Sequence, residues 1–460
     1  MKLNRIMIAA PKSGSGKTTI TCALLQALKG AGKNVISYKC GPDYIDPMFH
    51  QKVIDIPAKN LDTFFTGEEE TKRLFLKNRT EKDFVVIEGV MGLYDGLGGI
   101  REEGSSYHLA KVTNTPIILV VDAKGMGKSV IAMIAGFLSY DKEHLIKGVV
   151  LNRMSKYYYE IIKPLIEDEL GVCVVGYFPE NKQFHIESRH LGLMMPGELK
   201  DIRAQLKETS MEIQKTISIE EIIRIAADAA KLECRASDLK VTKLCKSGEV
   251  PVIAVAQDEA FCFYYEDNLK LLQDYGAEII YFSPFHDKEI PKECHGILLG
   301  GGYPELYLEK LSQNQTMKKS IIKAINNHMP VIAECGGFMY LHKEIKDAND
   351  MTYEMVGAID GNCFYTGKLV RFGYIELKEK NANFLSKDEL IRGHEFHYYD
   401  SSYNGEDMVA RKPVTGREYD CVIDKADFWC GFPHLYYPSN PNFARNYVVK
   451  AYDYMRRQKG

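Results

Sequence analysis

A glycine-rich loop near the start of the chain constrains the fold more than any other feature. An apolar run at residues 6–10 leads into Pro-Lys-Ser-Gly-Ser-Gly-Lys-Thr-Thr at 11–19, and apolar residues at helical spacing follow. Strand, loop and helix in this order are typical of a P-loop, where backbone N–H groups and a helix amino terminus bind phosphate. Pro11 replaces the first consensus glycine, at a position that only turns the chain. The alternative, a Gly/Ser-rich surface turn, leaves the flanking strand and helix unexplained.

This P-loop predicts specific contacts with ATP. Lys17 is expected to reach the β- and γ-phosphates, and the Thr18 hydroxyl is expected to ligate Mg²⁺. The remaining residues of the predicted ATP cradle are Gly14, Ser15, Gly16 and Thr19. Lys12 is either a second phosphate-contacting lysine, as in some dimeric P-loop ATPases, or a solvated surface lysine. The sequence leaves both readings, and a homodimer, open.

The apolar runs predict two α/β domains. Val- and Ile-rich runs at residues 6–10, 35–39, 84–90, 117–121 and 148–152 alternate with amphipathic stretches, as in a doubly wound parallel sheet. A second alternating series begins at Pro251, and an antiparallel extension is expected between about 355 and 440. We therefore expect a P-loop domain over 1–230, a linker over 231–249 and a second α/β domain over 250–460.

Polar residues follow several strands of the first predicted domain. Asp43 and Asp46 come after the second run, while Glu88 and Asp95 lie at and after the third. Carboxylates at this edge are suitable Mg²⁺ ligands beside the P-loop, whereas each aspartate taken alone reads as a turn residue. Their occurrence together favours a functional role beside the P-loop over separate roles in turns. Asn152 ends the fifth run, where it either reads a purine base or caps the next helix.

A cysteine in the second domain has the setting of a nucleophile. Cys335 lies between an apolar strand and a Gly-Gly helix start, where we expect the helix amino terminus to stabilise its thiolate. Gly336 leaves its N–H free for an oxyanion, and the triple glycine ending at Gly302 offers further donors. His434 is the candidate base. The alternative for Cys335 is a buried small hydrophobic residue.

Composition excludes several classes of protein. The net charge is −3 without a long single-sign run, so we expect neither a nucleic-acid nor an anionic-membrane partner. No apolar stretch approaches the roughly 18 residues that span a bilayer, and we expect a cytoplasmic protein. The eleven cysteines include no C-x-x-C pair, which argues against a disulfide framework and a zinc site.

Taken together, these segments closely resemble the cobyrinate a,c-diamide synthase family over essentially the whole chain. The resemblance implies a dethiobiotin-synthetase-like ATP domain followed by a class I glutamine amidotransferase domain. The segments that carry it are residues 41–47 (GPDYIDP), 88–96 (EGVMGLYDG), 188–193 (SRHLGL), 300–305 (GGGYPE), 333–337 (AECGG) and 392–398 (RGHEFHY).

The resemblance also implies residue roles. Cys335 would be the glutaminase nucleophile, and His434 would raise its nucleophilicity. Two further sets are implied: the Mg²⁺ ligands Thr18, Asp43 and Glu88, and the corrinoid-binding residues Asp46, Asp95, Arg189 and His190. For Arg189 and His190 a structural role in their loop is equally compatible. His394 and His397 match a family motif without an assigned role.

The chain departs from other amidotransferases at two positions. Tyr436 lies where many have the glutamate of a His-x-Glu pair, and Ala333 lies where others carry glycine. The first departure leads us to expect a Cys–His dyad rather than a triad.

The two predicted chemistries complement each other. ATP would convert the a- and c-side-chain carboxylates of cobyrinic acid into acyl phosphates, and ammonia from L-glutamine would replace the phosphate. A rival within the family is a,c-diamide synthesis on nickel-sirohydrochlorin. A rival from another class is a P-loop ATPase switch with an inactive amidotransferase-like domain.

Overall fold

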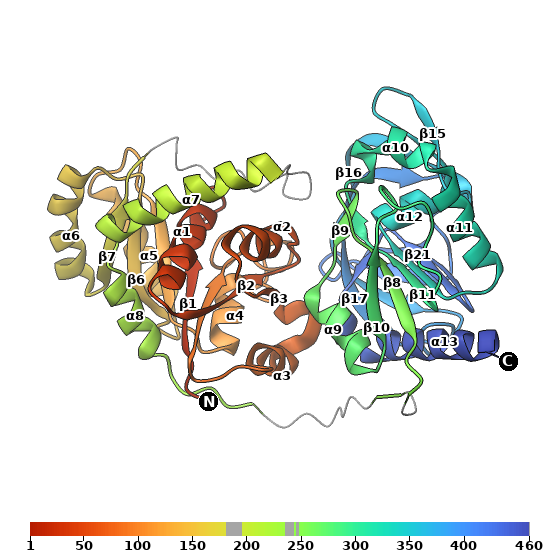
Figure 1. The fold of residues 1–460 in the computed structure, drawn as a ribbon. Helices are drawn as coiled ribbons and strands as arrows, with labels where there is room; N and C mark the ends of the chain where they lie inside the picture. Colours follow the sequence, from red (N-terminus) through yellow and green to blue (C-terminus); the bar gives the residue numbers. More distant parts are fainter. Residues whose placement is uncertain (181–195, 235–242, 245–247, 460) are drawn as a thin grey trace. The chain divides into compact units, whose positions relative to one another are not determined.

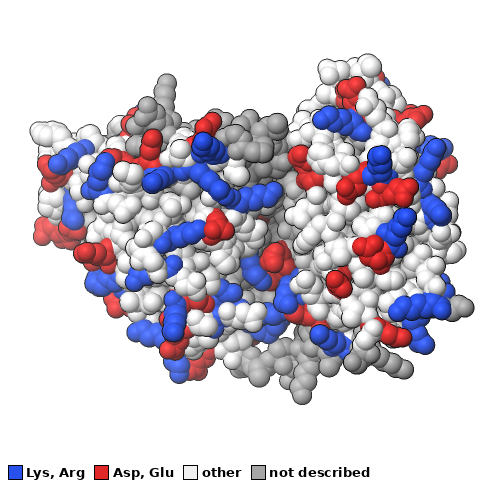
Figure 2. Space-filling model, in the orientation of Figure 1, with Lys and Arg blue, Asp and Glu red and all other residues white. Residues whose placement is uncertain are grey.

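The computed structural model describes residues 1–180, 196–234, 243–244 and 248–459. The chain folds into two compact units, Met1–Ser237 and Asp238–Gly460 (Figure 1). Two residues of the expected linker form hydrogen bonds with these units. The Leu232 N–H donates to the Met1 carbonyl of the first unit, and the Leu244 N–H donates to the Tyr275 carbonyl of the second. Basic and acidic side chains are intermixed on the face shown in Figure 2, as suits a net charge of −3.

The first unit is built on a seven-stranded sheet with the order β3-β2-β4-β1-β5-β6-β7. Every neighbouring pair is parallel, so the carboxyl ends of all the strands share one edge. This confirms the predicted doubly wound α/β fold. The strands are β1 (Asn4–Ala9), β2 (Asn34–Cys40), β3 (Ala58–Leu61), β4 (Asp83–Glu88), β5 (Ile117–Asp122), β6 (Ile146–Asn152) and β7 (Cys173–Phe178).

Helices follow most of these strands and cover the sheet. The apolar face of α1 (Lys17–Gly30) packs with α7 (Pro196–Thr216) over strand residues such as Ile6, Ile8 and Val120 (Figure 1). Serine hydroxyls cap α4, α6 and α8 by accepting backbone N–H groups of the first turn. The remaining helices are α2 (Ile45–Phe49), π-helical η1 (His50–Ile54), α3 (Thr63–Leu76), 3₁₀-helical η2 (Leu97–Gly99), α4 (Ser106–Val112), α5 (Ser129–Tyr140), α6 (Lys156–Leu170) and α8 (Ile219–Ala227).

The second unit combines a mainly parallel sheet with an antiparallel extension. The first sheet has the order β10-β8-β11-β13-β21-β20, and only its edge strand β20 is antiparallel. Its strands are β8 (Val252–Ala256), β10 (Glu278–Phe282), β11 (Gly296–Leu299), β13 (Val331–Glu334), β20 (Ile423–Lys425) and β21 (Phe428–Gly431).

The extension is a seven-stranded sheet dominated by a long antiparallel hairpin, β16 (Ile359–Glu379) and β17 (Leu390–Ser401). Its other strands are β14 (His342–Lys346), β15 (Thr352–Glu354), β18 (Met408–Arg411), β19 (Glu418–Cys421) and β22 (His434–Leu435). A short pair joins β9 (Phe261–Phe263) to β12 (Gly301–Gly302).

Helices pack on both sheets of this unit. The last helix, α13 (Pro441–Lys459), buries Tyr447, Val448 and Ala451. The others are α9 (Glu266–Asp274), η5 (Pro304–Leu306), α10 (Leu308–Gln313), α11 (Gln315–Asn326), α12 (Gly336–Leu341) and η6 (Tyr437–Ser439). None of the helices in the described ranges combines the length and hydropathy needed to cross a bilayer.

Candidate active sites

The P-loop follows β1 and ends in the first turn of α1. Gly14 and Gly16 have φ angles of 77° and 89°, so both need the left-handed backbone that glycine allows. A Cβ atom on Gly16 would lie 2.2 Å from Nδ2 of Asn152, and this amide donates to the Ser15 carbonyl at 2.8 Å. Asn152 therefore supports the loop backbone, a contact that the sequence did not predict. Its purine-reading role stays a prediction.

The two P-loop lysines have different surroundings. Lys12 is exposed, whereas Lys17 is buried and its ammonium donates to the Met91 carbonyl in the loop after β4. Burial lowers the pKa of Lys17 to about 8, and the neighbouring charge of Lys39 adds to this effect. Lys17 is thus held beside the β4 loop, at the sheet edge where phosphate is expected.

A buried charge cluster lies behind the P-loop. The Thr18 hydroxyl donates to Glu88 at 2.7 Å, and Lys39 Nζ lies 3.0 Å from the same carboxylate oxygen. Lys39 also ion-pairs with Asp46, and His50 Nε2 lies 3.4 Å from the second Glu88 oxygen. The hydroxyl of Thr18 and the carboxylate of Glu88 supply the oxygen chemistry that Mg²⁺ prefers, so this pair fits the ion.

The pKa shifts in this cluster follow from burial and pairing. Burial opposes the charge on Lys39, but Asp46 and Glu88 outweigh it and raise the pKa of Lys39 above its ordinary value. Burial would raise the pKa of Glu88, but Lys39, with His50 and Thr18, holds it below its ordinary range. Burial and the charge of Glu88 raise the pKa of Asp46, and the ion pair with Lys39 opposes this rise. Glu88 therefore keeps its negative charge next to Thr18.

Asp43 and Asp95 stabilise turns. Asp43 Oδ1 accepts the N–H groups of Ile45 and Asp46, and Asp95 Oδ2 accepts the Gly92 N–H at 3.0 Å. These are the turn roles that the sequence offered as the alternative, and the metal and substrate roles of both residues stay predictions. Arg189 and His190 lie outside the described residues.

Lys39 and His50 are site residues that the sequence analysis missed. Lys39 is the only charged residue of β2, where the residues from Val35 to Tyr38 are all buried. A lysine at the end of such a strand is a signal for a buried ion pair, because an unpaired charge is rarely buried. His50 carried no comparable signal, since its contact depends on how α2 and η1 fold back onto the sheet.

Cys335 lies at a sharp turn between β13 and α12. Its φ and ψ are 47° and −100°, a strained conformation for a residue with a side chain. Its N–H donates to the Gly431 carbonyl at 2.8 Å, so β21 fixes the turn. A Cβ atom on Gly337 would lie 2.3 Å from the Leu299 carbonyl oxygen, which explains the glycine in the first turn of α12.

The predicted oxyanion donors lie close together. A Cβ atom built on Gly336 would lie 3.3 Å from the backbone nitrogen of Gly302 and 3.0 Å from Cδ of Pro304. Gly336 is also the first residue of α12, so the helix itself provides no acceptor for its N–H. The glycine loop after β11 and the cysteine turn after β13 therefore meet as an oxyanion site requires.

His434 reaches the same edge from the antiparallel extension. A Cβ atom on Gly301 would lie 2.5 Å from its Cε1 atom, so the imidazole packs directly on the glycine loop. Burial lowers the pKa of His434 to about 3, with a further contribution from His397, and the ring is therefore neutral near pH 7. A neutral imidazole is the form that accepts a proton.

The thiol state of Cys335 differs from expectation. Burial raises its pKa above the ordinary value, the charge of Glu305 adds to this, and the Gly336 N–H opposes it. The N–H of Gly336 at the start of α12 does lower the pKa of Cys335, as the sequence predicts, but burial outweighs this effect because α12 is short and Cys335 is only 7% exposed. Cys335 rests as a thiol and depends on a base.

Tyr436, rather than a carboxylate, lies two residues after His434, and other side chains contact the base. Tyr436 points to Asp267, to which its hydroxyl donates at 3.2 Å. His394 stacks on His434, and its Nδ1 lies 3.2 Å from the Tyr265 hydroxyl.

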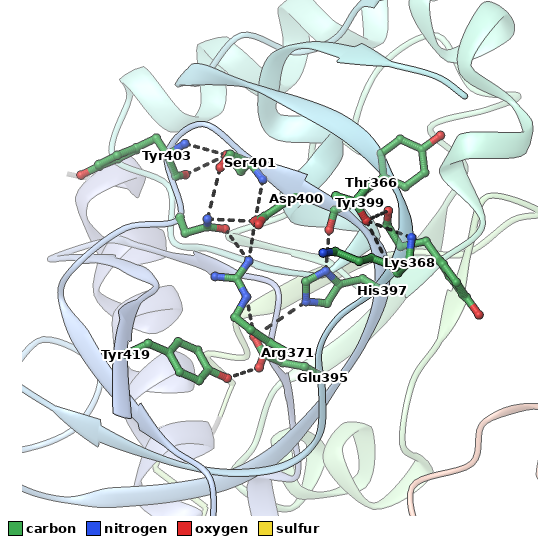
Figure 3. Close-up of polar contacts among 12 residues, drawn as sticks. Thr366, Lys368, Arg371, Glu395, His397, Tyr399, Asp400, Ser401, Tyr403 and Tyr419 are labelled. Carbon is green, nitrogen blue, oxygen red and sulfur yellow. Dashed lines mark hydrogen bonds and ion pairs between the residues drawn. The ribbon is translucent and has the colours of Figure 1, made fainter. Parts of the chain in front are cut away.

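A partly buried polar network lies on β16, β17 and β19 (Figure 3). His397 Nδ1 donates to the Tyr399 carbonyl at 2.6 Å, and its Nε2 lies 3.8 Å from Glu395. The Tyr419 hydroxyl donates to Glu395, and Arg371 ion-pairs with Asp400. The His397 ring stacks on Phe432 at 4.0 Å, next to the Gly431–His434 segment. Through this stacking, the network supports the segment that contains His434. The HEFH motif at residues 394–397 therefore has a structural role beside the base.

Comparison with known proteins assigns both halves of the chain. Residues 6–193 match the CobQ/CobB/MinD/ParA nucleotide binding domain, and residues 252–441 match the CobB/CobQ-like glutamine amidotransferase domain. A cobyrinate a,c-diamide synthase from Caldanaerobacter subterraneus subsp. tengcongensis is 39% identical over 93% of this chain and 94% of its own. Proteins of the same name from Dehalococcoides mccartyi and Listeria innocua are 37% and 38% identical, over 97% and 95% of this chain and 98% and 97% of their own. The chain therefore belongs to the cobyrinate a,c-diamide synthase family of glutamine-dependent amidotransferase ligases, with a nucleotide-binding P-loop domain.

Proposed function

We propose that this protein uses ATP to activate the a- and c-side-chain carboxylates of cobyrinic acid and amidates them with ammonia from L-glutamine. The names of the relatives support the substrate. The observation that carries the proposal is that one chain holds two sites. One is a P-loop backed by the charged Thr18–Glu88–Lys39 cluster, and the other is a glycine loop that packs both on the Cys335 turn and on a neutral imidazole.

The first reaction forms an acyl phosphate. A carboxylate oxygen of the substrate attacks the γ-phosphorus of ATP, the bond from that phosphorus to the bridging oxygen breaks, and ADP leaves. Lys17, with the N–H groups of Gly14, Ser15 and Gly16, holds the phosphates. Thr18 and Glu88 would hold Mg²⁺, which would supply positive charge beside the phosphates. Ammonia then attacks the acyl carbon, phosphate leaves, and a proton is lost to give the amide.

The second reaction releases the ammonia. His434 takes the proton of the Cys335 thiol, and the thiolate attacks the carboxamide carbon of glutamine. The N–H groups of Gly302 and Gly336 donate to the oxyanion, a contribution of about 10²- to 10³-fold in rate per donor. The imidazolium returns its proton to the leaving nitrogen, and ammonia departs. Water, activated by His434, hydrolyses the thioester and releases glutamate.

Two experiments test these steps. Cys335→Ser is expected to lose glutamine-dependent amidation and to keep amidation with added ammonium, whereas loss of both activities would count against the separation of the two chemistries. Cobyrinic acid labelled with ¹⁸O in its carboxylates is expected to transfer one ¹⁸O to phosphate per amide formed. Unlabelled phosphate would exclude the acyl phosphate.

A further inference from the structure

Glu305 lies beside the glutaminase nucleophile and has no role in the chemistry described above. It belongs to η5, directly after Pro304, whose ring packs against the Gly336 backbone at the Cys335 turn. Its side chain is partly exposed, so a ligand can reach the carboxylate. Glu305 therefore lies on the accessible side of the oxyanion loop.

Two neighbours indicate that the carboxylate lies near the nucleophile. Among the charged groups that act on the Cys335 thiol, Glu305 acts most strongly and raises the pKa of the thiol, and it does the same for the Tyr399 hydroxyl. Cys335 directly follows β13 and Tyr399 lies on β17, so Glu305 lies close to both elements.

Among the described residues, the charge of the Glu305 carboxylate is not compensated by a cation. Within the part of the chain that the structure describes, no lysine, arginine or histidine ion-pairs with Glu305. Burial raises the pKa of Glu305 to about 7, and only its own backbone N–H opposes this. A positive ligand group would supply the missing compensation.

The glutaminase substrate carries such a group. L-glutamine has its α-ammonium group at the opposite end of a short side chain from the carboxamide that Cys335 attacks. We propose that Glu305 binds the α-ammonium group of L-glutamine and so selects this amide over others. This inference rests on the proposed glutaminase reaction and adds a specificity-determining residue to it.

A substrate comparison isolates this contact. Glutaramate has the carboxamide and carboxylate of glutamine and lacks the α-amino group. Wild-type protein is expected to hydrolyse glutamine with a kcat/KM about 10- to 100-fold above that for glutaramate, the range of one charge-assisted hydrogen bond. In Glu305→Gln the value for glutamine falls to that for glutaramate, whose own value is unchanged. Glu309→Gln, on the exposed face of α10, is the matched control.

A binding measurement checks the same contact without turnover. In the Cys335→Ser background, glutamine is expected to raise the melting temperature, and Glu305→Gln is expected to abolish that shift without lowering the melting temperature of the free protein. A Glu305→Gln protein that keeps the wild-type preference for glutamine, or keeps the thermal shift, overturns the proposal. Failure of wild-type protein to hydrolyse glutamine would instead overturn the glutaminase reaction.

Discussion

The imidazole rings of His394 and His434 stack with their centroids 4.9 Å apart and their planes 16° from parallel. The two residues are register partners in β17 and β22, and the Tyr265 hydroxyl lies within hydrogen-bonding distance of the His394 Nδ1 atom. His394 thus holds one face of the candidate base, while the glycine loop holds its edge.

Replacing His394 tests this support. His394→Ala is expected to lower the glutaminase kcat about 2- to 13-fold, because an aromatic pair contributes about 0.5–1.5 kcal/mol. His394→Phe keeps a flat ring and is expected to recover most of the loss. Steady-state glutamate release measures both variants, with the exposed His328→Ala as control. Equal losses in the Ala and Phe variants would show that stacking is not the contribution of His394.

Adding one methyl group to the glycine loop is expected to displace the base. In Gly301→Ala the new Cβ would lie 2.5 Å from His434 Cε1, so the imidazole must move. A misplacement of this size is expected to lower glutaminase kcat about 100-fold, while amidation with ammonium continues. Gly136→Ala on α5, where a Cβ meets no atom within 4 Å, is the control. Unchanged glutamate release from Gly301→Ala would contradict the placement of His434.

The pH dependence of glutamine use is expected to report Glu305. Since its pKa is raised to about 7, kcat/KM for glutamine should rise as the pH passes through about 7, and this limb should flatten in Glu305→Gln. A raised carboxyl pKa means that the folded protein binds more protons than the unfolded chain between about pH 4.3 and 7, so stability falls over that window. Glu305→Gln should therefore raise the melting temperature at pH 8 and not at pH 4. An unchanged melting temperature at pH 8 would contradict the burial of this charge.

Removing Lys39 is expected to affect stability and ATP use together. Lys39→Ala leaves Asp46 and Glu88 buried without their cation, a change that costs about 3–5 kcal/mol of unfolding free energy. Ammonium-dependent amidation should fall as well, whereas glutaminase activity of the folded protein should persist. Denaturant unfolding provides the measurement. Lys29→Ala removes a more exposed pair and should cost less than about 1 kcal/mol; a similar cost for both variants would refute the buried cluster.

Local patterns account for what the sequence could predict. The P-loop and the Cys335 turn are each encoded in a few consecutive residues, where glycines provide the backbone that phosphate or an oxyanion requires. The alternating apolar runs were likewise enough to predict both α/β sheets, because parallel strands are buried on both faces and therefore consist mainly of apolar residues.

The features that the sequence did not predict depend on contacts between residues that are far apart in the chain. Lys39 meets Glu88 because β2 and β4 pair in the register that places these two residues side by side. Glu305 lies near Cys335 because Pro304, in the loop after β11, packs on Gly336 in the turn after β13. The resting thiol of Cys335 escaped prediction for the same reason, since burial is a property of the assembled fold. Single residues without a motif therefore needed the structure.

The most direct test of the account follows nitrogen from glutamine into the corrinoid. Cobyrinic acid incubated with the protein, ATP, Mg²⁺ and amide-¹⁵N glutamine should gain two amides by mass spectrometry, each carrying ¹⁵N and each accompanied by one ADP. Nickel-sirohydrochlorin, tested in parallel, should remain unamidated. Absence of ¹⁵N in the product, or undiminished ¹⁵N transfer by Cys335→Ser, would contradict the claim that the two sites make one product.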